Sequence, residues 1–522
     1  MSESEKKDIN LAAGVVSFFT LLSRILGLVR DMVIASMFGS GMVTDAFFVA
    51  FRIPNLLRRL FAEGSLTISF IPVFTEYLYT RSKKDAFELA RVILTVLSFI
   101  LIVVTVLGIV LSPWIVRLQA FGFGGSGAKY DLTVLLTRIT FPYIFFISIV
   151  AFFMGILNSL RHFAAPAAAP IFLNLSIIGA AYLISPQLTE PVTGLAIGVL
   201  IGGLLQLLIQ IPWVIKEGFV PLPCWNLRHP ALKQIGILML PAVFGSAVYQ
   251  INQFIGTLLA SFLAEGSVSW LYYADRLVQF PLGVFALAIS TAVLPSLSKE
   301  AAQNRFTDFG DTVKHSLQLI FFITLPAMAG LIVLGKPVIQ ILFQHGVFDS
   351  RASEMTYKAL LFYATGLWAF AGIRVTVAAF YALKDTKTPV KIAIVAMSTN
   401  LVLGLSLMGQ LQHAGLAFAL SLASTVQLFL LLFFLNRKIN MGDIKPVIVS
   451  ASKASLSALV MGITIYYMHL KWLTTGPETN IWIDVLNLSG LVISGIMVYF
   501  TIARLLDCHE IKAVLSMLHL KQ

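Results

Sequence analysis

The sequence predicts an all-α polytopic membrane protein with about 14 transmembrane helices. Of its 522 residues, 58% are hydrophobic and only 12% are charged, and the mean hydropathy is +0.88. A soluble domain carries roughly 25% charged residues, so this composition argues against a soluble fold. The apolar runs are long and continuous, whereas a transmembrane β-barrel would show segments of about ten residues with alternating polarity.

Fourteen apolar segments are long enough to cross a bilayer, which takes about 20 residues of α-helix. They cover residues 11–38, 42–62, 86–117, 131–158, 167–185, 193–215, 233–264, 268–295, 313–342, 355–383, 389–409, 413–436, 447–470 and 480–503. Lysine and arginine gather in the loops on one side, which is the positive-inside pattern. An even number of spans then places both termini in the cytoplasm. The net charge of +12 follows from this topology and does not indicate nucleic-acid binding.

The first twelve predicted spans form two similar halves. Gly194 and Gln206 recur 221 residues later as Gly415 and Gln427, and Leu160 recurs 223 residues later as Leu383. The repeat predicts two pseudo-symmetric six-helix lobes, residues 1–218 and 219–440, followed by two additional helices and a cytoplasmic tail in residues 441–522. Halves with an even number of spans are parallel and are related by an axis along the membrane normal.

Charged residues inside the first two spans are the strongest functional signal. A charge at the bilayer centre costs ~3 kcal/mol on insertion scales, so such residues normally face a protein or water interior. Helical spacing places polar residues on one face of each helix. These residues are Ser17, Thr20, Arg24, Gly27 and Asp31 on the first helix, and Asp45, Arg52, Asn55 and Arg59 on the second. Together they predict a mostly cationic cavity and an anionic ligand.

Phosphate is the anion that several converging guanidinium groups favour, because their fork geometry is bidentate. The repeat aligns Arg52 with Asp275, which brings charges of the second half into the prediction. The primary substrate-binding candidates are Arg24, Arg30, Asp31, Asp45, Arg52, Arg58 and Arg276, and the secondary ones are Asn55, Arg59, Asp275 and Arg374. Structural ion pairing stays open for Arg30 and Asp31, as does snorkelling to the interface for Arg58 and Arg59. Pro54 is expected to interrupt the second span, and Gly27 to loosen the first.

No motif predicts an enzyme. The sequence lacks a Walker loop, a nucleophile elbow and a cluster of His, Cys and carboxylate residues at metal-binding spacing. We therefore expect no catalytic residue, no metal and no cofactor.

Four segments resemble the MurJ/MviN family of lipid II flippases, which belongs to the multidrug, oligosaccharidyl-lipid and polysaccharide exporter superfamily. The segments are SRILGLVRD, TDAFFVAFRIPNLLRRLFAEG, YADRLVQFPLGV and FYALKDTKTP. The resemblance covers essentially the whole chain. It implies that the protein moves lipid II, the undecaprenyl-diphosphate-linked disaccharide-pentapeptide precursor of peptidoglycan, from the inner to the outer leaflet of the bacterial cytoplasmic membrane. It also implies a central cavity with alternating access, lined by Arg24, Arg30, Asp31, Asp45, Arg58 and Arg276.

The resemblance implies partners as well: lipid II, membrane lipids, a coupling ion or the membrane potential, and the cell-wall synthesis machinery around a monomeric transporter. Asp31 and Asp45 are expected to pair with arginines when the site is empty. A sodium site of some family members is not carried over, because the eleventh span offers Ser398, Thr399 and Asn400 but no carboxylate. Three alternatives stay open. They are an exporter of another lipid-linked oligosaccharide or amphiphile, a membrane enzyme acting on lipid-linked sugars, and a scaffold without transport activity.

Overall fold

The computed structural model describes residues 3–58, 67–472 and 481–518, and within these ranges it contains helices and no strand. The all-α prediction is confirmed. The chain divides into two compact units, Met1–Gly266 (unit 1) and Ser267–Gln522 (unit 2), which are described separately. The predicted boundaries at residues 218 and 440 follow the sequence repeat and stay a prediction. Unit 1 extends beyond residue 218 because α10 (Pro230–Ser261) packs against α3 (Thr67–Thr80).

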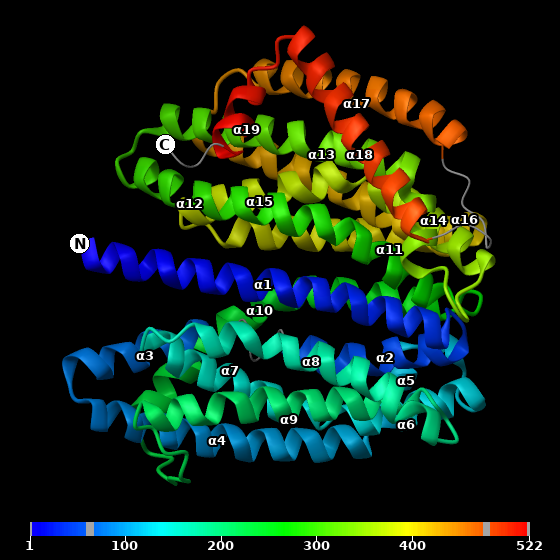
Figure 1. Ribbon diagram of the computed structural model, residues 1–522. Helices are drawn as coiled ribbons and strands as arrows, with labels where there is room; N and C mark the ends of the chain where they lie inside the picture. Colours follow the sequence, from blue (N-terminus) through cyan, green and yellow to red (C-terminus); the bar gives the residue numbers. More distant parts are fainter. Residues whose placement is uncertain (1–2, 59–66, 473–480, 519–522) are drawn as a thin grey trace. The chain divides into compact units, whose positions relative to one another are not determined.

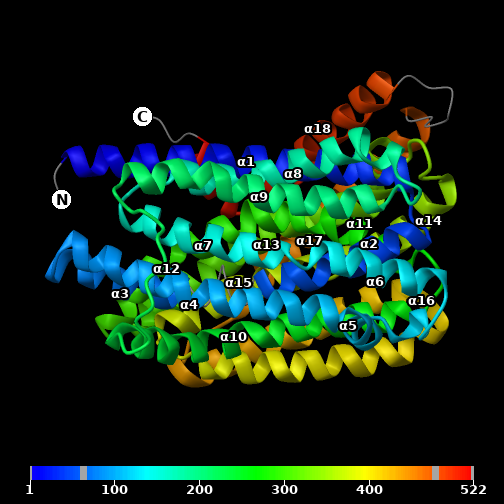
Figure 2. The same cartoon turned by 90° about the horizontal axis from the view of Figure 1, so that it is seen from below.

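Unit 1 is an all-helical bundle (Figures 1 and 2). Helix α1 packs against α8, α8 against α9, and α9 against α7, while α2 packs against α6. Besides α3 and α10, its elements are α1 (Glu3–Phe38), α2 (Met42–Leu57), α4 (Lys83–Val110), α5 (Ser112–Gln119), the 3-10 helix η2 (Phe121–Phe123), α6 (Ala128–Thr140), α7 (Tyr143–Ser159), α8 (Ala164–Leu183), the 3-10 helix η3 (Ser185–Gln187) and α9 (Thr193–Lys216).

Close packing of α8 and α9 depends on small residues. A Cβ atom added at Gly198 of α9 would lie 2.7 Å from the Cβ of Ala180 on α8, and one added at Gly202 would lie 2.8 Å from Leu173 Cδ1. Small residues let helices approach closely in lipid, where no hydrophobic force drives them together. The glycines of α9 are therefore structural.

A second contribution to the core comes from aromatic rings, such as Phe70 of α3 and Phe152 of α7, whose centroids are 4.7 Å apart.

The predicted interruptions of the first two helices do not occur within the described residues. Helix α1 continues through Gly27, and α2 continues through Pro54 to Leu57. Proline cannot donate to the carbonyl four residues earlier, which here is Ala50. That carbonyl accepts a long hydrogen bond of 3.4 Å from the Thr140 hydroxyl of α6, so the loss is partly offset. The structure also contains α3, which was not predicted as a separate helix.

Unit 2 contains the helices from α11 onward, including the three that follow the repeat. Its elements are α11 (Ser267–Pro281), the π-helix η4 (Leu282–Ala286), α12 (Leu287–Ala302), α13 (Phe306–Phe343), α14 (Ser350–Ala364), α15 (Leu367–Ala382), α16 (Lys387–Ile439), α17 (Lys445–Trp472), α18 (Ile481–Leu505) and α19 (Glu510–Leu518). Helix α17 packs against α13 and α18. The Tyr499 hydroxyl of α18 donates to the Phe322 carbonyl of α13 at 2.7 Å, which fixes the added helices to the unit.

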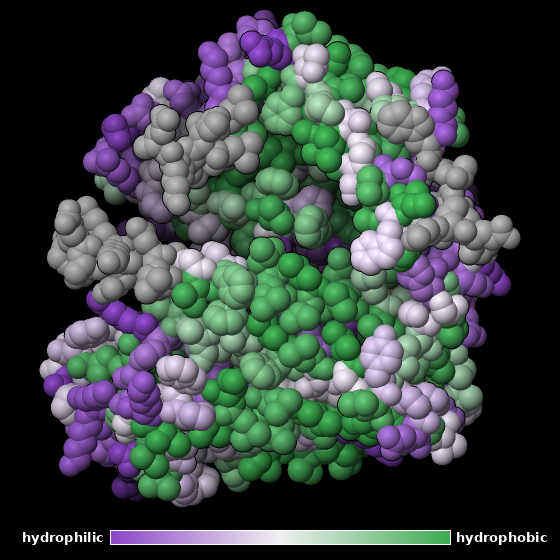
Figure 3. Space-filling model, viewed as in Figure 1, coloured by the Kyte–Doolittle hydropathy of each residue, from purple (hydrophilic) through white to green (hydrophobic). Residues whose placement is uncertain are grey.

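Nine helices in the described ranges are long and apolar enough to cross a membrane, or ten if the pair α14 and α15, bent by 45°, forms one span. The polytopic prediction is confirmed, but the count of fourteen is not. Helix α16 covers two predicted spans, residues 389–409 and 413–436, and its backbone leaves the helical conformation between them at Gln412, where φ is 52°. Hydrophobic residues cover much of the surface of unit 1 that Figure 3 shows. Such a surface suits a lipid environment.

Candidate anion-binding site

Arg30 and Asp31 form a buried ion pair about two turns before the C-terminal end of α1. The Arg30 guanidinium donates from Nη2 and Nε to Asp31 Oδ1, at 2.7 and 3.0 Å. Its Nη1 donates to Asn174 Oδ1 of α8 at 3.1 Å, and Asn174 donates in turn to the Ser23 carbonyl at 3.0 Å. Burying two charges is costly unless they are paired and hydrogen-bonded. The pair therefore joins α1 to α8, and the expected pairing of Asp31 with an arginine is present.

Asp45 is buried at the start of α2 and has a lysine as its partner. Its Oδ2 atom accepts from Lys129 Nζ at 2.8 Å and from the Gly266 amide at 2.8 Å. Beside it, the Met42 amide donates to Glu265 Oε1 at 2.6 Å. These contacts fasten the turn between α1 and α2 to α6 and to the segment after α10. Asp45 is thus closed in by protein groups, and Lys129 is an ion-pair partner that the sequence did not predict.

The two further arginines of α2 that the structure describes each contact a neutral polar group. Arg52 donates to the Gln253 carbonyl of α10 at 3.2 Å and to the Thr257 hydroxyl of the same helix. Arg58 Nε donates to Asn55 Oδ1, one turn earlier on α2, at 3.0 Å. Both side chains are half-buried. Arg59, a secondary candidate, lies outside the described residues.

Arg24 differs from the other candidates of unit 1. It is exposed near the middle of α1, and no hydrogen bond or ion pair joins its guanidinium to any of the residues that the structure describes. Ser17 and Thr20, which precede it on the same face, are also exposed. A guanidinium in a membrane-spanning helix requires a polar partner, since leaving it in hydrocarbon costs ~3 kcal/mol or more. An anionic ligand supplies such a partner.

The candidates of unit 2 lie on α11 and α15. Arg276 is exposed, donates from Nη2 to the Tyr272 hydroxyl at 2.6 Å, and lies with its guanidinium carbon 4.7 Å from the centre of the Tyr272 ring. Asp275 is half-buried and accepts from Gln279 Nε2 at 3.4 Å. Arg374 is half-buried on α15. Tyr272 holds Arg276 in an extended position by two separate contacts.

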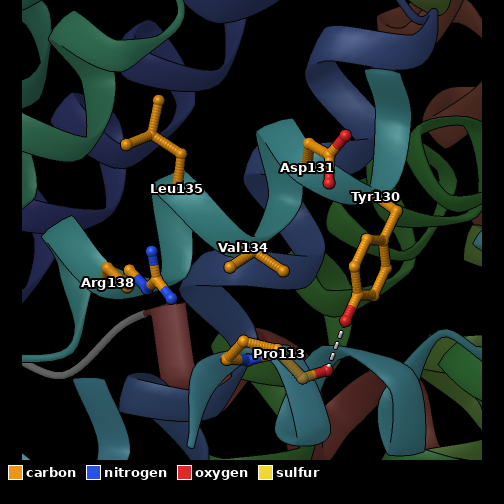
Figure 4. A pocket seen from close by; sticks show the side chains of 6 residues that line it. All are labelled: Pro113, Tyr130, Asp131, Val134, Leu135 and Arg138. Atoms are coloured by element: carbon orange, nitrogen blue, oxygen red, sulfur yellow. Dashed lines mark hydrogen bonds between the residues drawn. The ribbon is translucent and has the colours of Figure 1, made fainter. Parts of the chain in front are cut away.

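A shallow pocket of about 290 Å³ lies beside α5 and α6 of unit 1 (Figure 4). It is lined by Pro113, Tyr130, Asp131, Val134, Leu135 and Arg138. The Tyr130 hydroxyl donates to the Pro113 carbonyl at 2.9 Å across its lower edge. None of the candidate residues lines this pocket. It is therefore not the predicted anion site.

The sequence did not predict which residues pair with the charged side chains of the first two helices. Asn174, Lys129 and Thr257 lie 144, 84 and 205 residues from the charged groups that they contact. No short motif carries that information, because the helices that bring these residues together are distant in sequence. Across the described ranges, no three residues of the His, Cys, Asp and Glu types are grouped so that they could hold a metal ion.

Comparison with known proteins identifies the family. The model of the family described as "Lipid II flippase MurJ" matches residues 34–484. The chain is 39% identical over 506 residues to the probable lipid II flippase MurJ of Vibrio cholerae, covering 94% of this chain and 95% of that protein. It is 39% identical over 427 residues to the lipid II flippase MurJ of Burkholderia cenocepacia, covering 81% of this chain and 83% of that protein.

Solved structures agree with the sequence comparisons. A structure described as lipid II flippase MurJ in an inward closed conformation matches with a TM-score of 0.78 and 29% identity, over 94% of this chain and 98% of that one. An inward-facing multidrug transporter of the MATE family shares the fold, with a TM-score of 0.71 and 15% identity over 82% of this chain and 98% of that one. From the family model and from relatives that match it nearly end to end, the chain belongs to the lipid II flippase MurJ family.

Proposed function

We propose that this protein is a lipid II flippase that moves the lipid-linked peptidoglycan precursor from the inner to the outer leaflet of the bacterial cytoplasmic membrane. Family membership supports the substrate, and the apolar helices support a multi-pass protein of that membrane. The relatives are named as transporters and not as enzymes. Transport proceeds by alternating access, with both termini in the cytoplasm.

The exposed guanidinium of Arg24 is the observation that carries the binding proposal. The diphosphate of lipid II is a dianionic group that one or more guanidinium forks bind well. Arg24 and Arg58 bind it in unit 1, and Arg276 is the proposed phosphate ligand of unit 2. Arg30, Asp31, Asp45 and Arg52 act beside them by holding helices α1 and α2 in position. The undecaprenyl tail stays in the lipid or along α17 and α18.

The energy source and partners follow the family expectation. A monomer is proposed to couple transport to the membrane potential or to an ion gradient and to act beside the cell-wall synthesis machinery. No metal or cofactor enters the proposal. The positive charge of the site favours an anionic headgroup over a cationic drug, because like charges brought into a low-dielectric site repel strongly.

Binding of lipid II to the purified protein tests the role of Arg24. Arg24→Ala should weaken binding about tenfold or more, since a hydrogen bond to a charged group contributes about 1.5–3 kcal/mol. Arg24→Lys keeps the positive charge but lacks the two-pronged guanidinium, so its affinity for lipid II should lie between those of the wild type and Arg24→Ala. Arg138→Ala, which removes an exposed arginine of the same unit outside the proposed site, is the matched control and should bind as the wild type does. Equal affinities for wild type and Arg24→Ala would remove Arg24 from the binding site.

A further inference from the structure

Two loops at equivalent positions of the sequence repeat have the same backbone conformation. Arg161, between α7 and α8, has a φ of 64°, and Lys384, between α15 and α16, has a φ of 56°. The amides around them make matching hydrogen bonds, from Arg161 to Asn158 and from His162 to Leu157 in unit 1, and from Lys384 to Tyr381 and from Asp385 to Phe380 in unit 2. This pattern ends a helix by a left-handed residue. The loops are therefore structural equivalents 223 positions apart.

Each loop is joined to the end of a later helix by one ion pair, and the two pairs have opposite polarity. In unit 1, His162 Nε2 lies 2.8 Å from Glu217 Oε1, at the end of α9. In unit 2, Lys438 Nζ lies 2.6 Å from Asp385 Oδ2, in the last turn of α16. The loop thus carries the cation in unit 1 and the anion in unit 2. We call these pairs the first and the second latch.

Helix dipoles favour the second latch and oppose the first. A helix N-terminus stabilises anions and a C-terminus stabilises cations. Asp385 directly precedes α16 and accepts from the Thr388 amide at 3.0 Å, while Lys438 lies in the last turn of that element. In the first latch, a protonated His162 lies just before the N-terminus of α8, and Glu217 lies at the C-terminal end of α9. Both charges of the first latch face the unfavourable helix end.

The second latch keeps its charge over a wide pH range. Burial alone would raise the pKa of Asp385, but hydrogen bonds from Lys438 and Thr388 outweigh it and lower the pKa to about 2. A carboxylate with a lowered pKa contributes stability above its unfolded value of ~3.9 and loses it only as the pH falls through the folded value. The second latch therefore does not respond to pH in the neutral range.

We propose that the first latch is a pH-sensitive contact that holds the loop between α7 and α8 more tightly when His162 is protonated than when His162 is neutral. Histidine is the side chain whose charge normally changes between about pH 5 and 8. The charged groups around it are Glu217, its neighbour Arg161, and Lys83, whose Nζ is 3.7 Å from Glu217 Oε2. The Trp213 ring packs near the imidazole, with centroids 5.9 Å apart, and Lys216 lies 5.5 Å from that ring.

Lys83 gives the first latch a competing state. When His162 is neutral, Glu217 still has an ammonium group nearby, so the carboxylate stays paired while the loop loses its charged contact. The result is a loop in unit 1 that loosens with rising pH, whereas the equivalent loop in unit 2 stays fixed. This inference concerns the mechanics of the loop and does not depend on which substrate the protein transports.

Hydrogen exchange measured by mass spectrometry on the full-length protein tests the proposal, with rates corrected for the intrinsic effect of pH. Protection of residues 157–164 should fall roughly twofold to fivefold from pH 5.5 to pH 8, the range expected for a partly exposed ion pair. Protection of residues 380–388 should stay constant and serves as the internal reference. Constant protection in both segments, or an equal change in both, would overturn the proposal.

Variants separate the latch from a general effect of pH. Glu217→Gln should remove the pH dependence of residues 157–164 and leave residues 380–388 unchanged. The double variant His162→Asp with Glu217→Lys gives the first loop the polarity of the second and should keep it protected at both pH values. Conversely, Asp385→His with Lys438→Glu should transfer the pH dependence to residues 380–388. Persistence of the pH response in Glu217→Gln would show that the carboxylate is not part of the pH-sensitive contact.

Discussion

Single charged residues of unit 1 differ in what surrounds them, and this difference decides their roles. Arg30, Asp31 and Asp45 are almost fully buried and are held by protein groups at hydrogen-bonding distance. Arg24 is exposed on the same helix as Arg30. Removing one partner of a buried pair strands the other charge and is strongly destabilising. Substitutions at the buried charges should therefore lower stability, whereas Arg24→Ala should lower binding with little loss of stability.

Tyr272 is predicted to position Arg276. Tyr272→Phe keeps the ring under the guanidinium and removes only the hydroxyl that accepts from Nη2. We expect lipid II binding to weaken about fivefold, since one such hydrogen bond contributes about 1 kcal/mol. Binding to the purified variant measures the effect, and Tyr272→Leu, which also removes the ring, should weaken it further. An unchanged affinity in both variants would show that Tyr272 does not position the arginine for binding.

The sequence predicted which residues of the first helices carry charge, but not what each charge contacts. Helical spacing placed Arg24 and Asp31 on one face, yet Asp31 is buried and Arg24 is exposed. The partner of Arg30 on α8 could not be inferred, since the distance along the chain is 144 residues. Spacing within a helix predicts which residues share a face, whereas the burial of each residue depends on which other helices pack against it.

At the scale of elements, the ion pair of Asp45 and Lys129 is predicted to fasten α2 to α6. Asp45→Asn should lower the free energy of unfolding by about 1–3 kcal/mol, because the half-buried Lys129 ammonium loses its counter-charge. Thermal unfolding of the purified protein measures this. The double variant Asp45→Asn with Lys129→Met should be less destabilised than the sum of the single variants. Additive effects would mean that the pair does not couple the two helices.

The contact of α8 with α9 is predicted to tolerate no added methyl group at Gly198. Gly198→Ala places a Cβ 2.7 Å from that of Ala180, and overpacking of this kind costs about 1–3 kcal/mol. Gly179→Ala on α8 is the matched control, because no atom lies within 4 Å of its added Cβ. There, alanine should be neutral or stabilise the helix by roughly 0.5–1 kcal/mol. Similar unfolding temperatures for both variants would contradict the close approach of these helices.

Apolar runs predicted where helices lie and where one of them breaks, but a single proline did not predict a break. Pro54 was expected to interrupt its span, and α2 continues past it, since proline in the last turn of a helix leaves a single carbonyl to satisfy. The predicted spans 389–409 and 413–436 meet at Gln412, where the backbone of α16 leaves the helical conformation, so this break was predicted from the apolar runs. The polar residues between two apolar segments therefore located the break in α16, whereas Pro54 lies so close to the end of α2 that the helix tolerates it.

At the scale of the whole molecule, the class of the protein followed from composition and the family followed from four motifs. A chain with 12% charged residues and long apolar runs cannot cover a hydrophobic core with a polar surface, so composition alone predicts a membrane protein. The motifs carried the assignment to the lipid II flippase family, which the family model confirms over residues 34–484. The division of the halves at residues 218 and 440 came from the repeat alone and stays a prediction.

The amount of lipid II that is accessible on the outer face of living cells tests the proposed transport most directly. Cells depleted of their own flippase would express either this protein or its Arg24→Ala form at equal membrane levels. We expect the wild type to restore lipid II to the outer leaflet, where an external probe reaches it, and Arg24→Ala to restore little or none. If lipid II stays inside when the wild type is present, the proposed substrate is wrong and export of another lipid-linked oligosaccharide takes its place.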